Sequence, residues 1–276
     1  MLFVWYKVSF DEKWSHGSAV CETVYFFVEF VCVFPWKCVS LNNQNRGKIM
    51  DGILRKLPIG IQTFEKLREG DYLYVDKTAL VWRIASTETP YFLSRPRRFG
   101  KSLLLSTFEA YFEGKKELFE GLAIADMEKE WKTYPLFHLD LNAEKYDSPQ
   151  ALVEILSRQL TQWELKYGKG EDEETLSGRF AGVIRRACEQ SGRGVVVLVD
   201  EYDKPLLQAL GDDALLDDYR KTLKAFYGVL KSSDRYLRFV FLTGVTKFAQ
   251  VSVFSDLNQL NDICLLYTSP SPRDRG

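Results

Sequence analysis

The chain has 276 residues, 46% of them hydrophobic, and a formal net charge of −1. This length suits one large domain or two small ones, and the near-neutral charge excludes a general electrostatic attraction to nucleic acid or to an anionic membrane. Five cysteines without a CxxC pair and only two histidines exclude a zinc-ligand spacing, and they favour a reducing, cytoplasmic compartment.

Residues 1–49 differ from the rest of the chain because they contain eleven aromatic side chains. Their most apolar stretch, 24–39, is 16 residues long and includes a glutamate, a proline and a lysine, whereas a membrane-spanning helix needs about 20 apolar residues. We therefore expect no membrane segment. We expect 1–49 to be a non-native or disordered extension ahead of a start at Met50, with a β-rich extension or an amphipathic anchor as the alternatives.

The stretch 58–84 predicts two helices around a short extended segment. Phe64 and Leu67 are spaced to share one face of the first helix. Residues 72–75 form the extended segment, after which Asp76 can cap the second helix. The two tyrosines of the extended segment could stack on a nucleotide base, but we expect them to pack in the core.

A strand, a basic loop and an apolar helix follow one another in 91–108, and Gly100-Lys101-Ser102 stands where the helix begins. This is the arrangement of a phosphate-binding loop, in which backbone N–H groups and the dipole of the helix favour an anion. Lys101 is long enough to reach the β- and γ-phosphates, and the Ser102 hydroxyl can ligate Mg²⁺. The general motif has a glycine where this chain has Arg95, so a basic surface turn is the alternative. The residues that we expect to contact a nucleotide are Arg97, Arg98, Phe99, Gly100, Lys101, Ser102 and Leu103.

Alternating helix and strand patterns follow the loop. We expect a helix to continue over 111–120, a strand over 134–141, and amphipathic helices over 151–167 and 176–190. The strand carries His138, which has no second histidine beside it. We therefore expect a core or edge histidine there and not a metal ligand.

A second chemical signal lies at 195–204, VVVLVDEYDK. Five consecutive apolar residues predict a strand buried on both faces, as in a parallel sheet, and the strand carries Asp200 and Glu201 at its carboxyl end. In a P-loop ATPase, an aspartate at this position holds Mg²⁺ and a glutamate polarises the attacking water. The alternative is a strand that merely ends in an acidic turn. This alternative is less favoured, because a strand that ends in two acidic residues is much less common about a hundred residues after a Gly-Lys-Ser loop than it is alone.

The last predicted elements are a long amphipathic helix over 214–231 and a buried strand over 237–243. The strand ends at Thr243, which could touch the γ-phosphate or the attacking water. Thr246 is the second candidate for this role, and an ordinary turn threonine is the alternative. Residues 251–263 begin a further element.

Strands that alternate with helices predict an α/β fold with an open, mostly parallel sheet and helices on both faces. Ligands of such sheets bind beyond the carboxyl ends of the strands. The basic loop, Asp200-Glu201 and Thr243 all follow strand carboxyl ends, so we expect them to meet at one edge of the sheet.

Four stretches of the chain resemble the predicted AAA-ATPase-like family, which is widespread in bacteria. The resemblance covers most of 59–263, and an arginine in place of the first loop glycine is usual in that family. It implies a P-loop NTPase three-layer sandwich with sheet order 5-1-4-3-2, ATP binding and, often, a C-terminal nuclease-like domain of the restriction-endonuclease type. The four stretches are GIQTFEKLREGDYLYVDKT, FLSRPRRFGKSLLLSTFEAYF, VVVLVDEYDKPL and FLTGVTKFAQVSVFSDLNQLNDI.

The domain boundaries that we expect are 50–264 for the ATPase-like domain and 265–276 for an artefactual tail. The tail, LLYTSPSPRDRG, resembles a translated sequencing adapter. In that case the domain is truncated near Cys264 and the nuclease-like domain is lost. A disordered Ser/Pro tail is the alternative.

The motifs and the resemblance together predict a P-loop ATPase that uses ATP and Mg²⁺ and whose hydrolysis drives a conformational change. Lys101 would neutralise the β- and γ-phosphates, and Ser102 and Asp200 would hold the metal. Glu201 would orient the water, and Thr243 would sense the γ-phosphate. No residue is assigned as an arginine finger.

Other functions stay open at this point. The chief alternative is a nucleotide-dependent switch or scaffold that turns over little ATP and presents the lost nuclease-like domain. A nucleic-acid-binding module built on Arg95, Arg97 and Arg98 and a small-molecule kinase are weaker alternatives. A homo-oligomer, and a nucleic acid bound through the lost domain, stay open as partners, and no membrane partner is expected.

Overall fold

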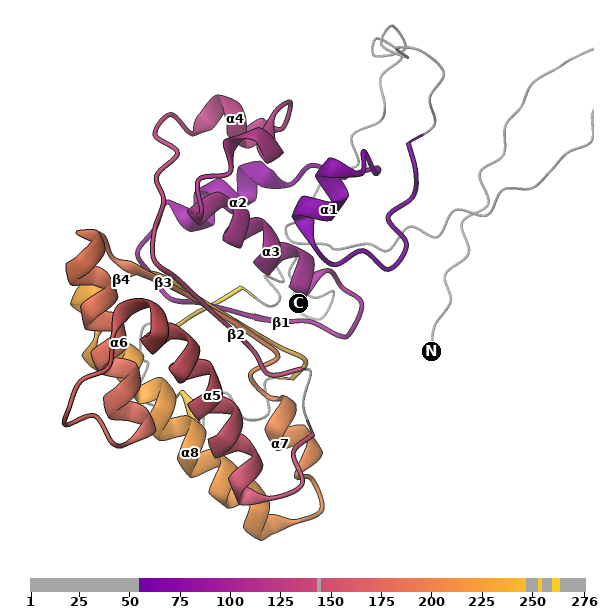
Figure 1. Cartoon of the computed structure of the whole chain (residues 1–276). Helices are drawn as coiled ribbons and strands as arrows, with labels where there is room; N and C mark the ends of the chain where they lie inside the picture. Colours follow the sequence, from indigo (N-terminus) through magenta and orange to yellow (C-terminus); the bar gives the residue numbers. More distant parts are fainter. Residues whose placement is uncertain (1–54, 143–144, 247–252, 255–259, 264–276) are drawn as a thin grey trace, which may run out of the picture. The chain divides into compact units, whose positions relative to one another are not determined.

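The computed structural model describes residues 55–142, 145–246, 253–254 and 260–263 (Figure 1). The expectations for residues 1–49 and 265–276, and for a start at Met50, lie outside these residues. No helix in the described part of the chain is both long enough and apolar enough to span a membrane.

The centre of the fold is a five-stranded sheet in which all paired strands are parallel and the order is β2-β3-β4-β1-β5. Read from the other edge, this is the predicted order 5-1-4-3-2, and both the parallel sheet and the α/β class are confirmed. The strands are β1 (Tyr91–Ser94), β2 (Leu136–Asp140), β3 (Val195–Asp200), β4 (Leu237–Gly244) and the short β5 (Asn261–Asp262).

Every residue of β3 is buried, as expected for a strand with neighbours on both sides and helices on both faces. Alternate residues of β3 enter different cores, because successive side chains of a strand point to opposite faces. Val197 and Val199 lie in one core, whereas Val196 and Leu198 lie in the other. The sheet is therefore the middle layer of a three-layer sandwich.

One face of the sheet is covered by short helices from the first half of the described chain. Their core is rich in aromatic rings: Phe108 of the helix after β1 lies 4.9 Å from Phe241 of β4 and 5.0 Å from Phe239, measured between ring centroids. The elements of this layer are α1 (Phe64–Glu69), α2 (Thr78–Ala85), α3 (Lys101–Phe112), η2 (Lys116–Phe119) and α4 (Ala123–Met127).

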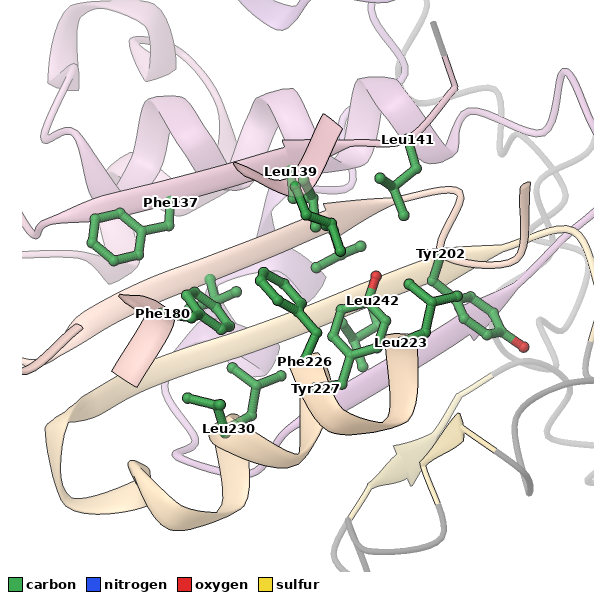
Figure 2. Packing of buried hydrophobic residues seen from close by; sticks show 14 of the residues in the cluster. Phe137, Leu139, Leu141, Phe180, Tyr202, Leu223, Phe226, Tyr227, Leu230 and Leu242 are labelled. Atoms are coloured by element: carbon green, nitrogen blue, oxygen red, sulfur yellow. The ribbon is translucent and has the colours of Figure 1, made fainter. Parts of the chain in front are cut away.

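The opposite face is covered by longer amphipathic helices, whose apolar stripes pack on the sheet and on one another (Figure 2). Phe180 stacks on Phe226 with ring centroids 4.4 Å apart, and Phe137 of β2 stacks on Trp163 at 4.6 Å. The elements of this layer are α5 (Pro149–Tyr167), α6 (Leu176–Ser191), α7 (Lys204–Gln208), α8 (Asp213–Ser232) and η3 (Asp234–Tyr236).

A buried ion pair joins α5 to α6 within this second layer. Arg179 donates to both carboxylate oxygens of Glu164, at 2.8 and 2.7 Å, and the two side chains are only 10% and 6% exposed. The same guanidinium also bonds to the hydroxyl oxygens of Ser157 and Thr161. The pair therefore meets the requirement that buried charges be fully hydrogen-bonded.

One sequence prediction of secondary structure was wrong. The helix after the loop ends at Phe112 and does not run through 111–120, because Gly114 adopts a left-handed φ of 72°. The extended segment expected over 72–75 contains no helix and makes one isolated parallel bridge, between Tyr72 and Lys56. Tyr74 lies at the edge of the first core, at 5.4 Å from Phe64, as expected for a packing residue.

Candidate functional site

The loop between β1 and α3 lies at the carboxyl edge of the sheet, where Gly100 sets the entry into the helix. Gly100 has φ 74° and ψ 19°, a left-handed conformation that glycine adopts without strain. Arg98 also has a positive φ, of 67°. These two left-handed residues turn the chain sharply, so that α3 begins at Lys101 with its free N–H groups at the same edge.

Lys101 is a buried cation that folds back over its own loop. Its side chain is 4% exposed, and Nζ donates to the carbonyl oxygens of Arg95 at 3.0 Å and Pro96 at 3.3 Å. The carboxylate of Glu201 lies across the loop, with Oε1 3.8 Å from Nζ. The ammonium group is therefore held at the centre of the loop by exchangeable partners.

Asp200 joins the loop helix to the strand beside it. The Ser102 hydroxyl donates to Asp200 Oδ2 at 2.6 Å, and the Thr243 hydroxyl donates to Oδ1 at 2.5 Å. These hydrogen bonds span 98 and 43 positions of sequence, and they link α3, β3 and β4. Parallel pairing of β3 with β4 explains the meeting, because both strands end at this edge.

Glu201 sits in a constrained position directly after β3. It has a left-handed φ of 51°, and its backbone N–H donates to Thr243 Oγ1 at 3.3 Å. Burial raises the pKa of its carboxyl, the nearby Lys101 ammonium partly opposes this shift, and Asp200 adds to it. Oε2 is buried and has no hydrogen-bond partner, so this carboxylate oxygen can accept a proton or a hydrogen bond from a ligand or water.

The remaining loop residues differ in exposure. Arg97 and Arg98 are exposed at the tip of the loop, and the charge of Arg97 favours the ionised form of Glu201. Phe99 is 40% exposed. Leu103 packs against the core of the α1–α4 layer, so only its backbone faces the loop.

Thr243 is fully buried, and its hydroxyl is engaged with Asp200 and with the N–H of Glu201. Thr246, the second candidate, donates its hydroxyl to Asp203 at 2.9 Å. Both threonines therefore orient acidic residues of the 200–203 segment. Sequence reasoning named neither of these pairings, because the partners lie more than 40 positions apart.

Asp203 is the site residue that sequence reasoning missed. It is 1% exposed and accepts hydrogen bonds from the segment that follows β4. The only sequence signal was its place in Asp-Glu-Tyr-Asp, three residues after Asp200.

His138 lies on edge strand β2, near but outside this group. Its Nδ1 is 3.6 Å from Glu109 of α3, and its buried Nε2 has no hydrogen-bond partner. Burial alone would lower the pKa of the imidazole, but Glu109, together with Asp200 and Asp140, raises it above its ordinary value. The expected core or edge position is confirmed, although one ring nitrogen is left unsatisfied.

The donor groups at this edge suit a nucleotide phosphate and a hard cation. The loop offers helix N–H groups and a central ammonium, and Ser102 and Asp200 offer two oxygens of the kind that Mg²⁺ prefers. Within the described residues, no three His, Cys, Asp or Glu side chains gather to make a larger metal site. A bound ion would therefore complete its shell with phosphate and water, as Mg²⁺ does at phosphate sites.

A three-layer α/β sandwich with a Gly-Lys-Ser loop after β1 and Asp-Glu after β3 defines a P-loop NTPase-like fold. A family model described as "Predicted AAA-ATPase" matches residues 58–254. The chain belongs to this family of predicted AAA-ATPases.

A protein of Azotobacter chroococcum mcd 1, described as "Uncharacterized protein in vnfD 5'region", is similar to this chain. The two are 44% identical over 210 residues, which cover 76% of this chain and 41% of the relative. The chain thus spans about two-fifths of the length of the relative that it matches. No solved structure matches the chain.

Proposed function

We propose that the described domain binds ATP with Mg²⁺ at the β1–α3 loop and hydrolyses it to drive a conformational change. One observation carries this proposal. Lys101 and Ser102 of α3 meet Asp200 and Glu201 of the β3 end, with 2.6 Å between Ser102 Oγ and Asp200 Oδ2 and 3.8 Å between Lys101 Nζ and Glu201 Oε1.

Lys101 would exchange its partners when ATP binds. Nζ is satisfied by two backbone carbonyls and by Glu201. A triphosphate carries more charge than these groups, so the ammonium would transfer to the β- and γ-phosphate oxygens. The N–H groups at the start of α3, including those of Ser102 and Leu103, would supply further donors.

Ser102 and Asp200 would hold the metal. Bound Mg²⁺ supplies Lewis-acid stabilisation of the charge on the phosphates. The Ser102–Asp200 hydrogen bond keeps the two side-chain oxygens together before any ion arrives, so little rearrangement is needed.

Glu201 would orient the attacking water. Its Oε2 is buried without a partner, and a carboxylate with a raised pKa is a better proton acceptor than an ordinary one. Thr243 is best assigned as a positioning residue, because its fully buried hydroxyl contacts Asp200 and the Glu201 N–H. Gly100 allows the turn, and Arg97, Arg98 and Phe99 are the exposed groups beside the phosphates.

The experiment is to measure phosphate release from Mg-ATP and equilibrium ATP binding on the full chain. Lys101→Ala should abolish measurable turnover. Glu201→Gln should bind ATP but lose turnover by about 10²-fold or more, because a positioned proton acceptor is removed. Glu189→Gln, at an exposed position on α6, is the matched control and should behave as wild type. Intact turnover in both site variants would overturn the role assignments.

A nucleotide-dependent switch with little turnover is the second candidate. The Lys101–Glu201 ion pair favours it, because a glutamate that binds the loop lysine is less available to polarise a water. Arg238 of β4 donates to the carbonyl oxygens of Ala85 and Thr87 and does not face the loop. A single turnover without further cycles would support the switch, whereas sustained phosphate release would support the ATPase.

The proposal also includes two partners of the whole protein, a nucleic acid and further copies of the chain. The relative in Azotobacter chroococcum mcd 1 is longer than the matched region, and a nuclease-like domain beyond it would supply contacts with nucleic acid. A homo-oligomer would supply an arginine from a neighbouring subunit. Phosphate release measured with and without DNA, and over a range of protein concentration, distinguishes these cases.

A further inference from the structure

Gly244, the last residue of β4, and the two residues after it, Val245 and Thr246, lie between two chemically important segments. On one side are the last residue of β1 and the first of the phosphate loop: Arg95 N–H donates to Gly244 O at 3.1 Å, and the Ser94 hydroxyl donates to Val245 O at 3.1 Å. On the other side are Tyr202 and Asp203, which follow Glu201.

Asp203 holds this segment through several donors at once. Its carboxylate accepts from Val245 N–H at 3.0 and 3.1 Å, from Thr246 N–H at 2.7 Å and from the Thr246 hydroxyl at 2.9 Å. The residue is 1% exposed. A buried carboxylate held by charge-assisted hydrogen bonds has one preferred position, so the segment it binds is fixed as well.

Tyr202 adds two further hydrogen bonds to this segment. We call the contacts of Tyr202 and Asp203 with residues 243–246 the clasp. Its N–H donates to Thr243 O at 2.9 Å, and its hydroxyl donates to Thr246 O at 3.1 Å. A Cβ placed on Gly244 would lie 2.7 Å from Tyr202 Cδ1 and 3.0 Å from Asp203 Oδ1, so these two side chains can pack directly on the backbone of residue 244 only because it is a glycine.

We infer that Asp203 is a positioning residue for the proposed hydrolysis. By pinning Val245 and Thr246 it sets the end of β4, and with it the Thr243 hydroxyl that orients Asp200 and the Glu201 N–H. The same segment contacts the loop at Arg95, whose carbonyl receives Lys101 Nζ. Asp203 thus couples the loop, the acidic pair and the chain that follows β4. This inference rests on the proposed function.

The test compares Asp203→Asn with Asp76→Asn in the full chain. Asp76 is exposed, but it is a control matched in hydrogen bonds: it too accepts from two backbone N–H groups and one threonine hydroxyl, those of Thr78 at the start of α2 and Ala123 at the start of α4. We expect Asp203→Asn to lower kcat about 10- to 100-fold, the effect of a small misplacement of reacting groups, with ATP affinity within about threefold of wild type. Asp76→Asn should keep the wild-type kcat.

Hydrogen exchange gives a readout that does not depend on ATP. The amides of Val245 and Thr246 should be protected in wild type and in Asp76→Asn, and should exchange faster in Asp203→Asn. Unchanged protection, or equal kcat for the two variants, would overturn the inference. Wild-type protein that shows the protection but neither binds nor hydrolyses ATP would overturn the proposed function and leave the clasp as a structural feature only.

If Asp203→Asn does not fold, the same measurements of kcat and hydrogen exchange on Tyr202→Phe test the inference. It removes only the hydroxyl that donates to Thr246 O and leaves the buried ring in place. The inference predicts a smaller fall in kcat in the same direction, with faster exchange at Thr246. A wild-type kcat in a folded Tyr202→Phe protein would contradict it.

Discussion

Gly244 gives a sharp quantitative test of the close packing behind the site. In Gly244→Ala, the new Cβ would lie 2.7 Å from Tyr202 Cδ1 and 3.0 Å from Asp203 Oδ1, whereas carbon atoms in favourable contact are about 3.5–4.0 Å apart. The Tyr202 ring would have to move by about 1 Å to reach that separation. The ring has little room to move, because it is fully buried and its centroid lies 4.9 Å from that of Phe254 and 5.4 Å from that of Phe92.

Overpacking of this kind costs about 1–3 kcal/mol of stability. In a domain of this size, each kcal/mol lowers the melting temperature by about 2–4 °C. Gly228→Ala is the control, because Gly228 lies inside α8 and a Cβ there meets nothing within 4 Å. Alanine should stabilise that helix by about 0.5–1 kcal/mol.

Urea and thermal unfolding of the two variants beside wild type provide the measurement. The structure predicts opposite signs: Gly244→Ala less stable and Gly228→Ala more stable. Equal or higher stability of Gly244→Ala would refute the close packing of the Tyr202 ring and the Asp203 carboxylate on the backbone of Gly244.

Two further predictions concern charges in the core and at the sheet edge. Arg179→Met should lower the free energy of unfolding by about 3–5 kcal/mol, because it leaves the Glu164 carboxylate buried without its cation. Urea denaturation would measure this change. A loss of stability below about 1 kcal/mol would show that the ion pair is solvated. The raised pKa of His138 means that its contribution to stability is fully present below its ordinary pKa of 6.5 and is lost as pH rises through the folded pKa. Urea midpoints should therefore fall as pH rises above about 6.5 in wild type and fall less in Glu109→Gln. Parallel pH profiles would contradict the pairing of Glu109 with His138.

Much of the fold could be predicted because it depends on local patterns. The valine run of β3 predicted a strand buried on both faces, and the structure confirms this. The periodicity over 151–167 and 176–190 predicted α5 and α6 to within a few residues. Parallel strands with helical crossovers then bring the strand ends to one edge, so the meeting of Lys101 with Glu201 followed from topology alone.

The remaining features depend on contacts between distant segments, which no local pattern reveals. Asp203 bonds to residues 245 and 246, more than 40 positions away, and in the sequence it looks like any acidic turn residue. Arg238 of β4 lies half-buried over Phe112 and Tyr134 and donates to the carbonyl oxygens of Ala85 and Thr87 at the end of α2, contacts that span about 150 positions of sequence. Sequence could place Thr243 at a strand end, but not its hydrogen bonds to Asp200 and to the N–H of Glu201, which join residues more than 40 positions apart.

Equilibrium binding of Mg-ATP by titration calorimetry tests the central claim most directly, with wild type, Lys101→Ala and the exposed-lysine control Lys166→Ala of α5. The account predicts that wild type and Lys166→Ala bind alike. Lys101→Ala should bind about 10- to 150-fold more weakly, because a charge-assisted contact with phosphate contributes about 1.5–3 kcal/mol. No binding by folded wild type, or equal affinity in Lys101→Ala, would contradict the account.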